Sequence, residues 1–140
     1  MSFLKRIMLF LLILLILLSV IAYFMLKDSN QTITYTQEDF INYHMLTDKD
    51  IANAPRITND FYFEASPGDG YPPTNSITFK NVDGINLLEA YLLSLGLKKE
   101  TRKMGDNDVW SKSDDSGRNL FYVSFDQVNK NATLTKSIGQ

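Results

Sequence analysis

Cysteine is absent from this chain of 140 residues. Its absence excludes a disulfide framework, a cysteine-based zinc site, a thiol nucleophile and a lipid anchor attached to cysteine. The sequence also contains no Gly-x-Ser-x-Gly motif, and Gly68 and Gly70 are not followed by the Gly-Lys-Ser/Thr of a phosphate-binding loop. We therefore expect no cofactor and no metal, and we expect that the protein is not an enzyme.

A single histidine and a few clustered acids are the remaining candidates for chemistry. His44 falls among apolar residues, which favours a packed or surface histidine over a catalytic base. The turns at 106–108 and 114–115 are rich in acids, but their spacing matches no EF-hand, which favours ordinary hairpin turns over a calcium site. The acids available for paired-carboxylate hydrolysis include Glu64, Asp69 and Glu89. No pattern shows that two of them face one cleft.

Charge is missing from one long run, Ile7–Leu26, in which Ser19 and Tyr23 carry the only hydroxyls. At about 1.5 Å per residue, such a helix spans roughly 30 Å, the thickness of the hydrocarbon core of a bilayer. A helix also satisfies its own backbone groups in lipid. The run therefore predicts a transmembrane helix over residues 7–26 that contacts the lipid bilayer.

The charges that flank this run predict its orientation. Lys5 and Arg6 precede it, whereas Lys27 is the only base close behind it. The positive-inside tendency then places residues 1–6 in the cytoplasm and the rest beyond the inner membrane, in the periplasm of a Gram-negative bacterium. The alternative is a signal peptide cleaved near Ala22, although the apolar run continues through Leu26 and exceeds the usual signal core.

The remaining residues predict one soluble α+β domain over 37–140, joined to the helix by a stalk or edge strand at 27–36. Thr36 can cap a helix over Gln37–Leu46. Two strands, Phe61–Glu64 and Ser76–Lys80, alternate so that their apolar side chains share one buried face. These side chains are Phe61, Phe63, Ile77 and Phe79.

The second half of the domain contains the clearest helix and a series of short strands. Leucines at helical spacing predict a helix over Ile85–Leu95, with Asn81 or Asp83 as its cap. Gly96 stands where a left-handed stop is expected, with Leu97 folding back as its apolar partner. Turn-rich segments then separate four expected strands, Lys98–Met104, Val109–Ser113, Asn119–Asp126 and Ala132–Ile138. Together these elements predict a mainly antiparallel sheet with one or two packed helices.

Charge and aromatic residues indicate where a partner would bind. Residues 28–97 contain ten acids and three bases, which disfavours nucleic acid and favours a basic protein partner. The Pro- and Gly-rich segment Ser66–Thr74 is longer than chain reversal needs and is a candidate recognition loop. The candidate contact residues are Asp69, Tyr71, Glu64, Tyr62 and Trp110, although Trp110 is equally well explained as a core residue.

An anchor, a small size, the lack of a catalytic signature and an acidic soluble part form a layout that resembles the membrane-anchored periplasmic immunity proteins of Gram-negative bacteria. The resemblance transfers no individual residues. It implies a tethered module that neutralises a toxin or enzyme by surface complementarity, with tethering raising its local concentration. The alternative hypothesis is a bitopic structural subunit of an envelope assembly, such as a secretion, pilus or division complex, whose helix makes specific contacts.

Overall fold

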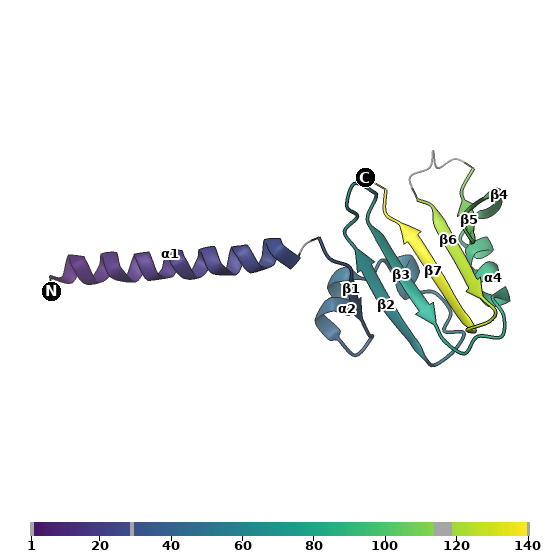
Figure 1. Cartoon of the computed structure of the whole chain (residues 1–140), viewed down its shortest axis with the longest axis horizontal. Helices are drawn as coiled ribbons and strands as arrows, with labels where there is room; N and C mark the ends of the chain where they lie inside the picture. The colour runs from purple at the N-terminus through teal and green to yellow at the C-terminus, as the bar shows by residue number, and fades with distance from the viewer. Residues whose placement is uncertain (1, 29, 114–118, 140) are drawn as a thin grey trace. The chain divides into compact units, whose positions relative to one another are not determined.

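The computed structural model describes residues 2–28, 30–113 and 119–139. The chain divides into two compact units, Met1–Gln31 and Thr32–Gln140 (Figure 1). The first unit is one apolar helix. The second combines a seven-stranded antiparallel sheet with three short helices within the described ranges, which confirms the expected α+β class.

The helix α1 covers Phe3–Asp28 without interruption. It includes the whole predicted run, and its Phe3–Leu26 portion is long and apolar enough to be either a membrane span or a signal sequence. The hydroxyl of Ser19 donates to the carbonyl of Leu15 at 2.9 Å, so this polar group is satisfied within the helix. Because α1 needs no outside partner for its backbone or for Ser19, its sequence suits a lipid environment.

The sheet has the order β1-β2-β3-β7-β6-β5-β4, and every neighbouring pair is antiparallel (Figure 1). The strands are β1 Ile33–Tyr35, β2 Phe61–Ser66, β3 Thr74–Phe79, β4 Lys98–Met104, β5 Asn107–Ser111, β6 Phe121–Asp126 and β7 Asn131–Ser137. The predicted strand positions are thus close to those observed. The pair β3–β7 joins the two halves of the chain across the middle of the sheet.

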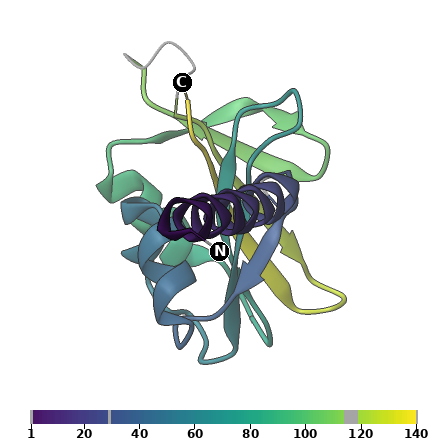
Figure 2. The same ribbon diagram turned by 90° about the vertical axis from the view of Figure 1, so that its left-hand side faces the viewer.

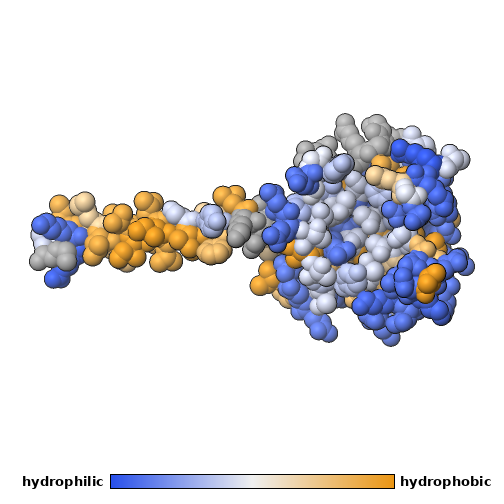
Figure 3. Space-filling view, viewed as in Figure 1, coloured by the Kyte–Doolittle hydropathy of each residue, from blue (hydrophilic) through white to orange (hydrophobic). Residues whose placement is uncertain are grey.

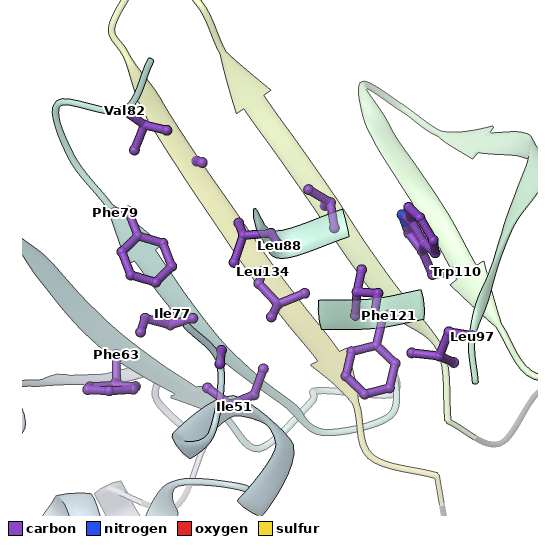
Figure 4. Packing of buried hydrophobic residues seen from close by; sticks show 14 of the residues in the cluster. Ile51, Phe63, Ile77, Phe79, Val82, Leu88, Leu97, Trp110, Phe121 and Leu134 are labelled. Carbon is purple, nitrogen blue, oxygen red and sulfur yellow. The ribbon is translucent and has the colours of Figure 1, made fainter. Parts of the chain in front are cut away.

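The helices α2 (Phe40–Leu46), α3 (Lys49–Ala52) and α4 (Asn86–Ser94) lie on the same side of the sheet (Figure 2). The core forms between them and one sheet face (Figure 4). Phe61 pairs with Phe79 and Phe63 pairs with Ile77, so the shared buried face predicted for these strands is confirmed. Burial of a side chain such as Phe63 contributes about 2 kcal/mol by area alone.

The helix α4 packs with Leu88 and Leu92 fully buried against the sheet. Gly96 has a φ of +81°, and its N–H donates to Leu93 while the N–H of Leu97 donates to Leu92. This pair of bonds is the Schellman arrangement, so the predicted stop is confirmed. The predicted cap is wrong, because α4 is preceded by Ile85 and receives no side-chain cap bond.

The first half of the folded unit differs most from the prediction. The segment 27–36 was expected to be a stalk or an edge strand. Its residues 33–35 form the edge strand β1. The helix α2 is capped by Asp39, whose carboxylate accepts from the N–H of Asn42, and not by Thr36. The short helix α3, capped by Asp48, lies between the predicted helix ending at Leu46 and the predicted strand beginning at Phe61, where no element was predicted. Its single turn is too brief to produce a visible period in the sequence.

A buried amide links the α2–α3 segment to the sheet. Asn75 of β3 occupies a position on the helix-covered face and is 1% exposed. Its Oδ1 accepts from the N–H of Asp48 at 2.8 Å, and its Nδ2 donates to the hydroxyl of Tyr35 and to the carbonyl of Glu64. These bonds satisfy the amide and fix the connection between β1 and β3, as a buried polar group requires.

An ion cluster of Lys136, Asp48 and Asp50 also connects the α2–α3 segment to the sheet. The ammonium of Lys136, on β7, lies 2.9 Å from a carboxylate oxygen of Asp48 and 2.7 Å from one of Asp50. The hydroxyl of Tyr91, on α4, donates to the carbonyl of Asp50 at 2.6 Å. Burial alone would lower the pKa of Lys136, but its hydrogen bonds to Asp50 and Asp48 outweigh that effect and raise the pKa. Lys136 therefore stays cationic and ties α3 to the sheet.

Candidate functional site

The face of the sheet opposite the helices is lined by hydroxyl side chains. On the two central strands they alternate with the buried apolar residues, because successive strand side chains point to opposite faces. We call this set the hydroxyl face, and it consists of Thr74, Ser76 and Thr78 on β3 and Thr133, Thr135 and Ser137 on β7. Figure 3, viewed onto this side, shows the pale colours of intermediate hydropathy across its middle.

Within the described part of the folded unit, the helices α2, α3 and α4 leave the hydroxyl face open, since the buried side chains of α3 and α4 and the packed residues of α2 all belong to the core on the other side. The face is closely packed along the sheet: the hydroxyls of Thr78 and Thr133 lie 3.0 Å apart, and Ser76 and Ser137 are each 8% exposed. An antiparallel sheet can leave such a polar face in water. The result is a broad surface of small, uncharged side chains.

Tyrosines and opposite charges flank the hydroxyl face. On one side β2 contributes Tyr62, beside the ammonium of Lys80, and Glu64, which accepts from Thr34. On the other side Tyr122 of β6 lies beside Thr135. A hollow of about 270 Å³ extends from there to β4 and is lined by Arg102, Lys103, Met104, Val109, Leu120 and Tyr122. Each side of the face therefore carries charges of both signs: Glu64 and Lys80 lie on the β2 side, and Arg102 is paired with Glu100 on the β4 side.

The structure divides the sequence-predicted contact residues into three places. Tyr62 and Glu64 lie on the same face as the hydroxyl residues, at the positions of β2 that pair with Thr78 and Ser76. Asp69 and Tyr71 are exposed in the loop between β2 and β3, and Tyr71 is 80% exposed. Trp110 is 3% exposed and belongs to the core cluster, as the core alternative expects.

The loop that carries Asp69 and Tyr71 depends on Gly68. This residue has a φ of +74°, and an added Cβ would meet the carbonyl oxygen of Tyr71 at 2.1 Å. Only glycine fits there. The loop therefore has a specific turn that presents Tyr71 outward from the end of the β2–β3 hairpin.

The enclosed pocket beside the ion cluster does not suit a substrate. It has a volume of about 100 Å³, and its charged lining comes from Asp50, Lys112 and Lys136. Ligand sites are usually several times larger. Because Lys136 is already bonded to two carboxylates, the cluster is better explained as a link between α3 and β7.

Two of the acids considered for catalysis lie on opposite sides of the sheet. Glu64 lies on the open side of β2, whereas Glu89 belongs to α4 on the covered side and lies 3.4 Å from Lys99. His44 is exposed, and its Nδ1 lies 2.9 Å from the carbonyl oxygen of Phe40 on its own helix. Among the described residues no three potential ligands cluster around a metal position. Asp114 and Asp115 lie outside the described residues, so the preference for ordinary hairpin turns over a calcium site stays a prediction.

The edge strand β4 is basic and is tied to β5 by Asp108. The carboxylate of Asp108 lies 2.7 Å from Nζ of Lys99 and 3.3 Å from Nζ of Lys103. The hydrogen bond from Lys99 is the main reason that the pKa of Asp108 is lowered. Lysines and a register shift between Lys99 and Lys103 also discourage pairing with a further strand at this edge. A partner is therefore more easily accommodated on the face of the sheet than at this edge.

We expect Asp108→Asn to lower the free energy of unfolding at neutral pH by about 0.5 kcal/mol, because the lysine partners are exposed. The folded pKa lies below the unfolded value of about 3.9, so the carboxylate stabilises the fold above that value and its contribution disappears as the pH falls through the folded pKa. Urea titrations at about pH 7 and about pH 2 measure this. An equal deficit at both pH values would contradict it, and the exposed neighbour Asp106→Asn is the control.

The hydroxyl face was not identified from the sequence, although a signal for it exists. Ser and Thr recur at every second position in both Thr74–Thr78 and Thr133–Ser137. Each segment alone predicts an amphipathic strand. Only the long-range pairing of β3 with β7 places the two rows side by side.

Comparison with known proteins adds no further constraint. No protein-family model matches the chain, and no curated protein and no solved structure matches it either. A function must therefore be argued from the surface itself.

Proposed function

We propose that this protein is a membrane-tethered protein-binding module, in which α1 is the anchor and the hydroxyl face is the centre of the binding surface. The observation that carries the proposal is the uncharged centre of the sheet, which the helices α2 to α4 leave open within the described residues, with tyrosines at its sides. Protein interfaces are depleted of charge at their centre and enriched in tyrosine. Tyrosine supplies rigid contact area while serine supplies adaptable hydrogen bonds, as in antibody paratopes.

The rims of the face indicate the charge of the partner. Glu64 and Asp69 belong to the β2–β3 hairpin, whereas Arg102 and Lys103 of β4, at the opposite edge, are already paired with Glu100 and Asp108. A partner with a basic region facing the hairpin would be steered onto the sheet by complementary charge. This pattern supports the hypothesis of an immunity protein that neutralises a basic toxin or effector, with no enzymatic activity of its own.

The anchoring part of the proposal rests on α1. The helix continues without a break through Ala22 to Asp28, which supports a retained anchor over cleavage near Ala22. Lys5 and Arg6 before the apolar run support a cytoplasmic N-terminus with the folded unit in the periplasm. The mass of the membrane-associated chain separates the two alternatives, because cleavage would remove the first residues.

The full chain, solubilised in mild detergent, is the bait for testing this function. We expect it to capture one stoichiometric protein from envelope fractions of the native organism or of neighbouring strains. Binding of the purified partner must then depend on the hydroxyl face. Capture of several envelope machine components in its place would favour an assembly subunit.

A feature of α1 favours that alternative, a bitopic structural subunit of an envelope assembly. Its apolar side chains, among them Met8, Leu12 and Leu15, are exposed within the chain, so a second membrane helix could pack against them. We expect a tethered inhibitor to keep its function when Ile7–Leu26 is replaced by an unrelated apolar helix. A subunit that uses the contacts of its helix would lose function in the same exchange, measured as partner recovery from membranes.

A further inference from the structure

The helix α2 presents apolar side chains that the folded unit leaves outside its core. Phe40, Ile41 and Met45 are 71%, 67% and 77% exposed, and none of the residues of α2 is buried. With His44 they occupy adjoining positions around the helix, since residues four apart lie on the same side. We call these four residues the α2 face. Figure 3 shows apolar colour at the edge of the folded unit where Figure 1 places α2.

The opposite side of α2 holds the helix firmly in place. Tyr43 packs edge-on against Phe63 with 5.3 Å between ring centroids, and Leu46 contacts the core. At the end of the helix the hydroxyl of Thr47 lies 3.0 Å from that of Tyr35 on β1. The outward position of the α2 face is therefore built into the fold and does not result from a loose segment.

His44 suits a surface that is partly apolar. Its ring contacts that of Phe40 in a tilted arrangement, with 4.2 Å between centroids and 37° between the ring planes, and its Nδ1 lies 2.9 Å from the carbonyl oxygen of Phe40. The polar nitrogen is thus partnered within the helix, while the ring adds to the apolar area. Aromatic rings with a satisfied or hydrated polar end are favoured at the boundary between lipid headgroups and acyl chains.

Only a short connection separates α1 from the folded unit along the chain. From Asp28 at the end of α1 to Ile33 at the start of β1, the chain can span at most roughly 18 Å when fully extended. The helix α2 follows β1 after the turn in which the N–H of Asp39 donates to Thr36. If α1 spans a bilayer, the surface that the α2 face meets at the highest local concentration is the lipid surface itself.

We infer that the α2 face docks on the lipid surface, with Phe40, Ile41 and Met45 entering the boundary between headgroups and acyl chains, as in interfacial helices. This inference rests on the anchoring role proposed above. Docking would restrict the orientation of the folded unit and leave the hydroxyl face, on the side of the sheet opposite α2, available to a partner. It also explains why three large apolar side chains remain outside the core.

The absence of cysteine allows single labelling sites in the full chain. Tyr23→Cys reports on the anchor, Met45→Cys on the α2 face, and Val128→Cys, which is 91% exposed in the β6–β7 turn, is the matched control. Each variant carries an environment-sensitive fluorophore and is reconstituted in phosphatidylcholine vesicles with spin-labelled phosphatidylcholine as quencher. We expect about two-fold quenching at positions 23 and 45 and little at position 128.

The outcomes distinguish a failure of the docking inference from a failure of the proposed anchoring role of α1. Quenching at Tyr23→Cys but not at Met45→Cys would overturn the inference and leave the anchor intact, whereas no quenching at Tyr23→Cys would overturn both. Efficient disulfide cross-linking between two Met45→Cys chains without quenching would show that a second copy covers the face, and would also overturn the inference. Adding Ile41→Glu to Met45→Cys is expected to reduce quenching at position 45 to the level of the control, with the fold checked by Trp110 fluorescence.

Discussion

Replacing Lys136 by methionine is expected to lower the free energy of unfolding by about 2 to 3 kcal/mol. The ammonium of Lys136 is bonded to Asp48 and Asp50, and its removal leaves two carboxylates side by side at the junction of α3 and β7. The effect should exceed that of an ordinary surface pair because these side chains are largely shielded from water. Urea unfolding of the full chain in detergent, followed through Trp110, measures it.

Lys130→Met is the matched control, since Lys130 lies 3.2 Å from Asp83 at an exposed site. We expect a loss below about 0.5 kcal/mol there. The double variant Asp50→Asn with Lys136→Met should lose less than the sum of its single variants, because the two residues act on each other directly. Equal losses for Lys136→Met and Lys130→Met would show that the cluster is no more than a surface pair.

The ion cluster is a feature that could not be predicted from the sequence. The strands could be predicted because apolar and polar residues alternate, and α4 because its leucines recur with a helical period. Lys136 stands on β7 at the position that pairs with Asn75, on the side of the core. No local pattern predicts that a lysine and an amide face inward, because their partners Asp48 and Asp50 lie far away in the sequence.

The helix α2 demonstrates a related limit. Its sequence, FINYHML, contains apolar or aromatic residues at nearly every position, so it defines no narrow apolar face. Tertiary contacts divide these residues: Tyr43 and Leu46 pack against the core, and the α2 face stays outside. A hydrophobic pattern indicates which residues avoid water in general, whereas the fold decides which of them are covered within one chain.

The candidate site was predicted only in part for the same reason. Tyr62 and Glu64 were selected as an aromatic and an acid, and the strand register places both on the open side of β2. Trp110 was selected by the same reasoning, but its strand position directs it into the core beside Phe121. The residue type indicates which side chains could contact a partner, and the pairing of strands decides which of them can reach one.

The most direct test of the hydroxyl face is a charge at its centre. We expect Thr135→Arg to weaken binding of the captured partner by about 100-fold or more, because a large unpaired cation would be buried where small hydroxyls make contact. Thr135 lies between Ser76 and Tyr122 in the strand register and points away from the core, so the fold should tolerate the change. Affinity for the purified partner, measured with the full chain in detergent, gives the result.

Ala90→Arg is the control for this substitution, since Ala90 is exposed on α4 on the covered side of the sheet. It adds the same charge and should leave partner binding unchanged, which separates a local effect from a change in net charge. If both variants weakened binding equally, long-range electrostatics would explain the loss. If Thr135→Arg bound as well as the unmodified chain, the partner would have to contact another surface and the hydroxyl face would lose its proposed role. A selective loss at Thr135 would place the partner on the open side of the sheet. The contribution of each charged residue beside the hydroxyl face to binding could then be measured by single substitutions.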